Sequence, residues 1–181
     1  LRFAAVDIAF EVIVVDDGST DGTQDHLARH EGLTVLRHES AQGFLRAANA
    51  GAALARGRAI VLLNNDTEVT AGWLDGLWQA LRRFARAGIV GPKVIYPDGG
   101  LQDAGGRVDH DGDPWMVGRG GNPFDPRHAY TREVDYVSGA AMMVDAALWR
   151  SAGGFSEAYV PAYFEDVDLC FRAREAGRRV L

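Results

Sequence analysis

Three apolar runs without alternation limit the folds that are open to this chain. Glu11–Val15, Leu33–Leu36 and Ala59–Leu63 are rich in aliphatic residues, and apolar and polar positions do not alternate along them. A strand with one face in water alternates, so continuous runs indicate strands that are covered on both faces. The segments between the runs, Thr23–Arg29 and Gly43–Ala55, have the length and composition of helices. This order predicts an α/β domain built on a mostly parallel sheet.

The second half of the chain is less regular. Large apolar residues recur at helical spacing from Trp73 to Phe84, and strand character follows at Ile89–Tyr96. Between residues 97 and 132 the periodicity gives way to Gly, Asp, Pro and His, which predicts a long irregular loop region. Regular structure is predicted to return in three segments: strands at 134–137 and 140–144, and a short helix near 146–151.

Composition restricts the domain count and the partners. A chain of 181 residues with 47% hydrophobic content can bury one good core, so residues 1–181 are expected to form a single domain. The formal net charge is −6 and the arginines are scattered, which argues against a nucleic-acid partner. The single cysteine, Cys170, excludes an internal disulfide and a Cys-based zinc site.

The ends of the chain bear on its location. No stretch approaches the roughly 18 apolar residues of a membrane span, and Leu1–Val6 lacks the order of a signal peptide. These features favour a cytoplasmic location. The chain starts with Leu1 rather than Met and stops at Arg179–Leu181, which has strand character. We therefore expect a fragment of a longer protein, truncated at both ends.

Acidic residues follow two of the predicted strands. Asp16 and Asp17 come after the first strand, and Asn65–Glu68 comes after the third. The carboxyl ends of parallel strands share one edge of a sheet, where open α/β folds bind their ligands. Acids can hold a phosphate there only through a divalent cation, and their hard oxygen atoms suit Mg²⁺ or Mn²⁺. The sequence thus predicts a metal-bridged, phosphorylated ligand.

A third acidic group lies near the C-terminal end. Glu165, Asp166 and Asp168 fall within four positions at the start of a helical run, Leu169–Ala176. Crowded acids repel one another and resist burial, which makes them candidates for an active site. The same residues also suit a helix N-terminus, where they favour the helix dipole and cap free N–H groups. From these residues alone, the active-site interpretation and the helix-capping interpretation are both open.

Together and in this order, the acidic segments resemble the inverting glycosyltransferases of family 2, which have the GT-A fold. The similarity is strongest to the branch with bacterial rhamnosyltransferase-like enzymes. The segments that carry it are Val14–Thr23, Leu62–Val69 and Phe164–Leu169, with further matches at Gln42–Phe44, Ala48–Gly51, Gly91–Lys93, Val137–Ala140 and Gly153–Glu157. The resemblance covers roughly residues 11 to 181.

The resemblance implies which residues bind the sugar donor. Asp17 takes the position that hydrogen-bonds the nucleobase, a role that suits a carboxylate because it can accept from a pyrimidine imide N–H. The alternative for Asp17 is an Asx residue that only shapes the turn. Asp16, Ser19 and Asn49 complete the nucleotide-sugar-binding set, together with Asn65 in the second acidic loop.

The family's metal-binding signature, often Asp-x-Asp, reads Asn64-Asn65-Asp66 in this chain. The resemblance therefore implies Asp66 as the ligand of a divalent metal, Mg²⁺ or Mn²⁺, with Asn65 facing the ribose or the diphosphate. Asp166 corresponds to the catalytic base, which removes the proton of the acceptor hydroxyl as its oxygen attacks the anomeric carbon. Glu165 is expected to orient the acceptor, and Asp168 to be a cap or structural acid.

The function that the resemblance implies is transfer of a sugar, with inversion, from a nucleotide-diphosphate donor to a hydroxyl acceptor. The donor is expected to be a UDP-, dTDP- or GDP-sugar, and the acceptor a saccharide or a lipid-linked molecule. The setting is cell-surface polysaccharide or glycolipid synthesis. A peripheral association with the inner face of the membrane would come through regions outside this segment.

Two alternative functions remain open, and the chain departs from the family pattern in two places. In the first alternative, a degenerate GT-A module serves for binding or scaffolding. A metal-dependent phosphatase of the haloacid-dehalogenase type fits less well, because Val15 stands where its motif needs an acid. The family's opening strand has no match before Glu11, and its downstream His lies beyond the last residue of the chain. His38 is expected at the surface. The aromatic residues Trp115, Tyr130 and Tyr136 are expected either to line the acceptor side by stacking on sugar faces or to serve in local packing.

Overall fold

The computed structural model describes residues 7–181, so Leu1–Val6, where the sequence lacks a leader pattern, lies outside the described residues. The larger elements are β1 (Val12–Asp16), α1 (Thr23–Leu27), β2 (Leu33–Arg37), α2 (Phe44–Leu54), β3 (Ala59–Leu63), α3 (Trp73–Arg83), β4 (Ala87–Val90), β9 (Ala141–Asp145), α4 (Ala146–Ala152), α5 (Glu165–Glu175) and β10 (Arg179–Val180). Each helix and strand predicted up to residue 84 is present, with ends that shift by at most two residues, whereas the single strand predicted at 89–96 is split into β4 and a short strand at Val94–Ile95.

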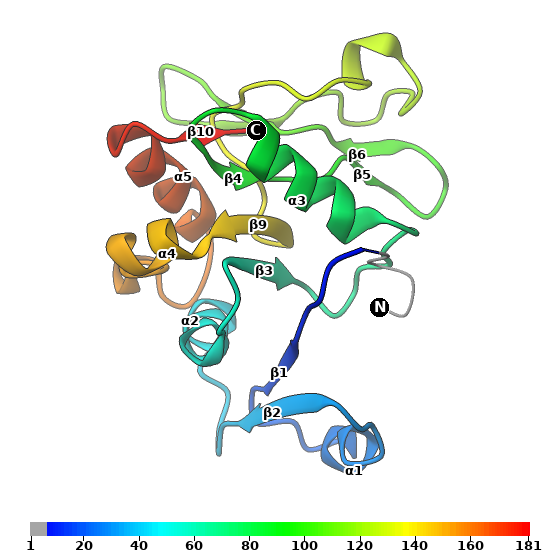
Figure 1. Ribbon diagram of the computed structural model, residues 1–181, viewed down its shortest axis with the longest axis vertical. Helices are drawn as coiled ribbons and strands as arrows, with labels where there is room; N and C mark the ends of the chain where they lie inside the picture. The colour runs from blue at the N-terminus through cyan, green and yellow to red at the C-terminus, as the bar shows by residue number, and fades with distance from the viewer. Residues whose placement is uncertain (1–6) are drawn as a thin grey trace.

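The main sheet has the strand order β10-β4-β9-β3 (Figure 1). Within it, β10 is parallel to β4, whereas β9 runs antiparallel to both β3 and β4. β1 and β2 form a separate two-stranded parallel sheet. The predicted mostly parallel sheet is therefore corrected to a mixed one. Parallel neighbours need a crossover connection, and β9 is instead reached through the long segment that follows β4, which returns the chain in the opposite direction.

Helices cover both faces of the main sheet, as the continuous apolar runs predicted. Met142 and Val144 of β9 point into a core that includes residues of α2, α4 and α5, whereas Met143 points into a second core against α3. Figure 1 shows α2, α4 and α5 on one side of the strands and α3 on the other. β9 therefore lies between the two cores, and its side chains alternate between them.

The β1–β2 sheet is covered less completely. α2 packs on β1 so closely that a Cβ atom at Gly51 would lie 2.9 Å from Cγ2 of Val15. β2 has mostly exposed residues, and Val35 is 45% exposed. The prediction that both faces of each strand are covered is thus wrong for β1 and β2, because their apolar runs are only half-buried.

Residues 97–132 contain more structure than the predicted irregular loop. Together with β5 (Val94–Ile95), β6 (Leu101–Asp103) forms one hairpin, and β7 (Gly106–Val108) pairs with β8 (Pro114–Met116) in another. Short 3-10 turns follow at Pro126–His128 and, later in the chain, at Glu157–Tyr159. The strand expected at 134–137 is reduced to an isolated bridge between Tyr136 and Gly106. No helix within residues 7–181 has the length and apolar character to cross a membrane.

Candidate active site

Asp16, the last residue of β1, is held inside its loop. Its Oδ1 accepts a hydrogen bond from the backbone N–H of Ser19 at 2.9 Å, and Arg37 at the end of β2 donates to its Oδ2. Hydrogen bonds from Ser19, through its side chain and its backbone, and the charge of Arg37 hold the pKa of Asp16 below its usual range. Arg37 also donates to the Ser19 carbonyl at 3.0 Å. Asp16 and Ser19 thus stabilise the turn that carries Asp17.

Asp17 joins this turn to the segment before α2. Its Oδ1 accepts from Nδ1 of His38 at 2.6 Å, and its Oδ2 accepts from the backbone N–H of Gly43 at 2.8 Å. The N–H of Gln42 lies within 3.0 Å of both oxygens. Burial would raise the pKa of Asp17, but these hydrogen bonds outweigh it and lower the pKa. The side chain is 24% exposed, so a ligand can still reach this carboxylate although both of its oxygens already accept hydrogen bonds.

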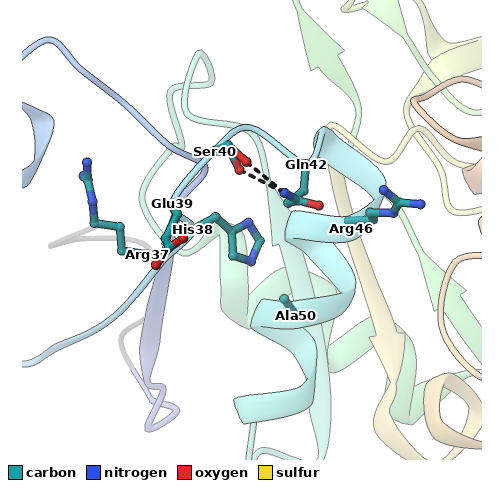
Figure 2. Close-up of a pocket in the computed structure, with 7 residues that line it drawn as sticks. All are labelled: Arg37, His38, Glu39, Ser40, Gln42, Arg46 and Ala50. Carbon is teal, nitrogen blue, oxygen red and sulfur yellow. Dashed lines mark hydrogen bonds between the residues drawn. The ribbon is translucent and has the colours of Figure 1, made fainter.

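His38 departs from the expected surface position, because its ring is anchored on Asp17. Figure 2 shows the ring turned toward α2, in a hollow of about 550 Å³ that Arg37, Ser40, Gln42 and Arg46 also line. Neither Asp66 nor Asp166 lines this hollow. His38 therefore both lines this hollow and contacts Asp17.

Asn49 uses its side-chain amide within the protein. Its Oδ1 accepts from the N–H of Phe155 at 2.9 Å, and its Nδ2 donates to the Phe155 carbonyl at 2.9 Å. These two bonds tie α2 to the segment after α4. Asn49 therefore has a structural role in this structure, and the contact with the nucleotide sugar stays a prediction that these bonds do not support.

Asn65 and Asp66 lie in an exposed turn directly after β3. The turn is closed by Thr67, whose N–H and hydroxyl both donate to the Asn64 carbonyl, at 3.3 and 2.6 Å. Within residues 7–181, no three His, Cys, Asp or Glu side chains gather closely enough to hold a metal among themselves. Mg²⁺ commonly takes one or two carboxylates and completes its shell with phosphates and water. The donors of Asp66 and Asn65 therefore fit a metal that is shared with a diphosphate.

Glu165 and Asp166 occupy the first turn of α5. Oδ2 of Asp166 accepts from the N–H of Gly139 at 2.8 Å, its Oδ1 accepts from the N–H of Val167 at 2.8 Å, and burial raises the pKa of this half-buried carboxyl. Glu165 is 5% exposed, and its Oε2 is buried without a hydrogen-bond partner in the described part of the chain. Burial, reinforced by the charge of Asp166, raises the pKa of Glu165 as well.

The backbone before α5 is unusual. Tyr163 and Phe164 have φ angles of 81° and 70°, a region that residues with side chains rarely adopt. Their rings are exposed, immediately before the two buried carboxyls. Such conformations cluster at functional sites, which agrees with a site at the start of α5.

The segment Gly139–Ala140 connects the acidic turn after β3 with α5. The N–H of Gly139 donates to Asp166, and the carbonyl of Ala140 accepts from the N–H of Asn64 at 2.8 Å. Two adjacent residues thus bring the predicted metal loop and the predicted base to one place. Neither contact follows from the spacing of the acids in the sequence.

Asp168 is a structural acid, as predicted. Arg172, one turn further along α5, donates to it from Nε at 2.8 Å. The same guanidinium donates to the carbonyls of Ala152 and Gly154, at 2.6 and 2.8 Å. Asp168 therefore holds the arginine that fastens α5 to the end of α4.

Asp103 and Tyr136 are buried residues that interact with Asp166, and the sequence did not predict this interaction. Asp103, at the end of β6, is 4% exposed, and its pKa is raised to about 6 by burial and by the charge of Asp166. Tyr136 is buried with its ring against Gly106, where a Cβ atom would lie 2.1 Å from the ring. Of the three aromatic residues predicted on the acceptor side, Tyr136 is thus the one near Asp166, whereas Trp115 and Tyr130 are exposed.

Comparisons with known proteins agree with this geometry. The family model described as Glycosyl transferase family 2 matches residues 5–151. The chain is 32% identical over 181 residues to the uncharacterized protein y4gI of Sinorhizobium fredii, covering 93% of this chain and 20% of that protein. It is 30% identical over 195 residues to an N-acetylglucosaminyl-diphospho-decaprenol L-rhamnosyltransferase of Mycobacterium tuberculosis, covering 92% of this chain and 61% of that one.

A solved structure shares the architecture. GalNAc-T7, crystallised with UDP, GalNAc and Mn²⁺, superposes with a TM-score of 0.73 at 19% identity, over 94% of this chain and 35% of that one. The likeness at this identity concerns the fold, and it confirms the GT-A architecture. The chain spans between 20% and 61% of the length of the two relatives above.

Proposed function

From the premise that this chain belongs to glycosyl transferase family 2, we propose that it transfers a sugar, with inversion, from a nucleotide-diphosphate donor to a hydroxyl acceptor. The donor is a UDP-, dTDP- or GDP-sugar, and the acceptor is a saccharide or a lipid-linked molecule. The relative from M. tuberculosis, named as a rhamnosyltransferase acting on a diphospho-decaprenol, supports an acceptor of this kind. The pathway is the synthesis of a cell-surface polysaccharide or glycolipid.

The donor is held along the loops that follow β1 and β3. Asp17 accepts a hydrogen bond from the nucleobase at an oxygen that it shares with its present donors, while Asp16 and Ser19 keep the loop in shape. Asp66 and Asn65, exposed in their turn, would hold a divalent metal together with the diphosphate. The chemistry that Mg²⁺ or Mn²⁺ would supply there is positive charge against the leaving diphosphate.

Asp166 accepts the proton of the acceptor hydroxyl. As this proton moves to the carboxylate, the hydroxyl oxygen forms a bond to the anomeric carbon, and the bond from that carbon to the diphosphate oxygen breaks. The oxygen attacks from the face opposite the leaving group, so the configuration inverts. The products are the glycosylated acceptor and a nucleoside diphosphate, with the proton on Asp166.

One observation carries the proposal: the carboxylate of Asp166 is oriented and tuned. The N–H groups of Gly139 and Val167 fix the two oxygens, and burial raises the pKa of the carboxyl. A base works best when its pKa approaches the working pH, so the raised pKa favours this carboxylate as the base.

The test compares two substitutions on one helix turn. Asp166→Asn is expected to lower turnover by roughly 10²- to 10⁴-fold while donor binding persists. Asp168→Asn is the matched control: it removes an equal charge from the same helix turn at a side chain that bonds Arg172 and not the Gly139 segment, so turnover should stay well above that of Asp166→Asn. Transfer is measured with a panel of UDP-, dTDP- and GDP-sugars in the presence of Mn²⁺. Equal turnover in wild type and Asp166→Asn would refute the assignment of the base.

The scaffold alternative predicts a different result in a binding assay. If the domain only binds or scaffolds, none of the nucleotide sugars should raise its melting temperature, with or without Mn²⁺. Stabilisation by one donor that depends on Mn²⁺ and is lost in Asp66→Ala supports the enzyme instead. The phosphatase alternative predicts release of inorganic phosphate and an aspartyl-phosphate intermediate.

A further inference from the structure

Asp103 is a buried carboxyl to which the mechanism above gives no role. It ends β6, within the segment predicted to be irregular, and only 4% of its surface is exposed. Its Oδ1 accepts a hydrogen bond from the N–H of Gly105 at 2.6 Å, the pattern of an Asx turn. A turn needs only an acceptor oxygen, which Asn supplies equally well. The turn therefore does not explain why a charged group occupies a buried position.

Backbone contacts place Asp103 and Asp166 on the same segment. Directly after this turn, which runs from Asp103 to Gly105, the chain pairs with Tyr136: the N–H of Gly106 donates to the Tyr136 carbonyl at 2.9 Å. Three residues after Tyr136, the N–H of Gly139 donates to Asp166 at 2.8 Å. The segment from 136 to 139 therefore contacts the hairpin of Asp103 at one end and the predicted base at the other.

The charges of this cluster act on one another. Burial and the negative charge of Asp166 on α5 together raise the pKa of Asp103 to about 6, against the opposing effects of the hydrogen bond from Gly105 and the positive charge of Arg119 after β8. The pKa of Tyr136 is raised to about 12 by burial and by the same two carboxylates. Asp166 and Arg119 are thus the charged groups that act on Asp103, and Tyr136 is a third titratable group on which Asp103 itself acts.

We propose that Asp103 is a positioning residue that acts through Asp166, as the second member of a buried carboxyl pair on the acceptor side of the site. The inference rests on the proposed role of Asp166 as the base. When Asp103 is ionised, its negative charge increases the affinity of Asp166 for the proton that leaves the acceptor hydroxyl. When Asp103 is protonated, this electrostatic help is lost.

The activity test is a pH profile with a matched control. Turnover of the wild type is expected to rise as the pH increases through about 6, where Asp103 loses its proton. Asp103→Asn keeps the turn but removes the charge, so this rise should disappear and turnover at pH 7.5 should fall by about tenfold, the effect of roughly one pKa unit on the base. Asp98→Asn is the control, because Asp98 accepts from the N–H of Gly100 at 2.9 Å in an exposed turn of the same hairpin. Its profile should match the wild type.

A second measurement requires no transfer activity. The side-chain ¹³C carboxyl resonance of Asp103 is followed against pH in the wild type and in Asp166→Asn. Its midpoint should lie near 6 in the wild type and at lower pH in Asp166→Asn, because one negative charge is gone. This result supports the carboxyl pair even if no sugar is transferred, so it separates the pair from the proposed function. An unchanged midpoint, or an Asp103→Asn enzyme that keeps the wild-type profile, would overturn the proposal.

Discussion

At the scale of single residues, Asp17 has a structural role that can be measured apart from any ligand. Its carboxylate accepts from His38, Gln42 and Gly43, and its pKa is lowered in the folded protein. A carboxyl with a lowered pKa contributes stability at pH values above its ordinary pKa of 3.8, and this contribution is lost as the pH falls through the folded-state value.

Asp17→Asn should therefore lower the free energy of unfolding near pH 7 by on the order of 1 kcal/mol, the usual net value of a hydrogen bond. The difference from the wild type should shrink below pH 3.8 and disappear under strongly acidic conditions. Urea unfolding at several pH values measures it. Asp98→Asn, in an exposed turn, is the comparison that should show no such pH dependence, and a constant difference at all pH values would contradict the role of the charge.

The sequence indicated some of these residues and missed others for a physical reason. Asp17 and Asp166 follow apolar segments in motifs whose order is specific, so they could be singled out. His38 carries no spacing that distinguishes it from the exposed His26 and His30, and Asp103 lies in a segment rich in Gly and Asp. His38 contacts Asp17, which lies 21 positions earlier in the chain. Asp103 is affected by the charge of Asp166, which lies 63 positions later. No local pattern encodes such distances.

At the scale of elements, Asn49 fastens α2 to the segment between α4 and α5. Asn49→Ala would leave the N–H and carbonyl of Phe155, a residue that is 2% exposed, without their partners. Each unpaired buried group costs about 1–3 kcal/mol, so we expect a loss of about 2 kcal/mol or more in the free energy of unfolding. Asn49→Asp should also destabilise, since it places a carboxylate oxygen against the Phe155 carbonyl.

Asn65→Ala, in the exposed turn after β3, is the control and should change stability by no more than about 0.5 kcal/mol. Chemical denaturation of the three variants measures these differences. If Asn49→Ala unfolds like the wild type but loses donor binding, Asn49 serves the nucleotide sugar, as the family resemblance implies, and its structural role is minor.

Helices and strands with strong periodicity were predictable, and short ones were not. α2 and α3 have 11 residues each, enough to show an apolar face, and β3 was predicted with its observed ends. The strands β6, β7 and β8 have only three residues each, too few for any alternation to be read. Their pairing depends on partners across the hairpin, which explains why residues 97–132 appeared irregular from the sequence.

At the scale of the whole molecule, stability should be unevenly distributed. β9 lies between two cores, with Met142 and Val144 fully buried, whereas β1 and β2 form a separate sheet that is partly exposed. Backbone amides that open only on global unfolding exchange most slowly with solvent. Amides of β9 should therefore be protected by about 2 kcal/mol or more beyond those of β1 and β2.

Native-state hydrogen exchange measures this difference directly, with peptides that cover 141–145 compared with those that cover 12–16 and 33–37. β4, in the main sheet beside β9, serves as the internal control and should resemble β9. Equal protection of all four strands would show that the two sheets unfold as one unit.

The α/β class of the whole molecule followed from the order of strands and helices, but the direction of β9 did not. Its apolar run resembles those of β1 and β3, and an apolar run has the same composition whichever way it is paired. The direction depends on how the two hairpins between β4 and β9 turn the chain. Their short strands were invisible in the sequence, so the antiparallel pairing was as well.

The contacts of Gly139 and Ala140 have a consequence for substrate choice. In the proposed reaction they act as a spacer of fixed length, because consecutive Cα atoms are separated by about 3.8 Å and the two contacts are made by backbone groups. The distance between the turn after β3 and the N–H group that holds the proton acceptor is therefore set by the backbone. A bulkier sugar must then be accommodated by the residues around this gap. Among proteins that share this spacer, we therefore expect donor preference to vary with the hairpins of residues 97–132.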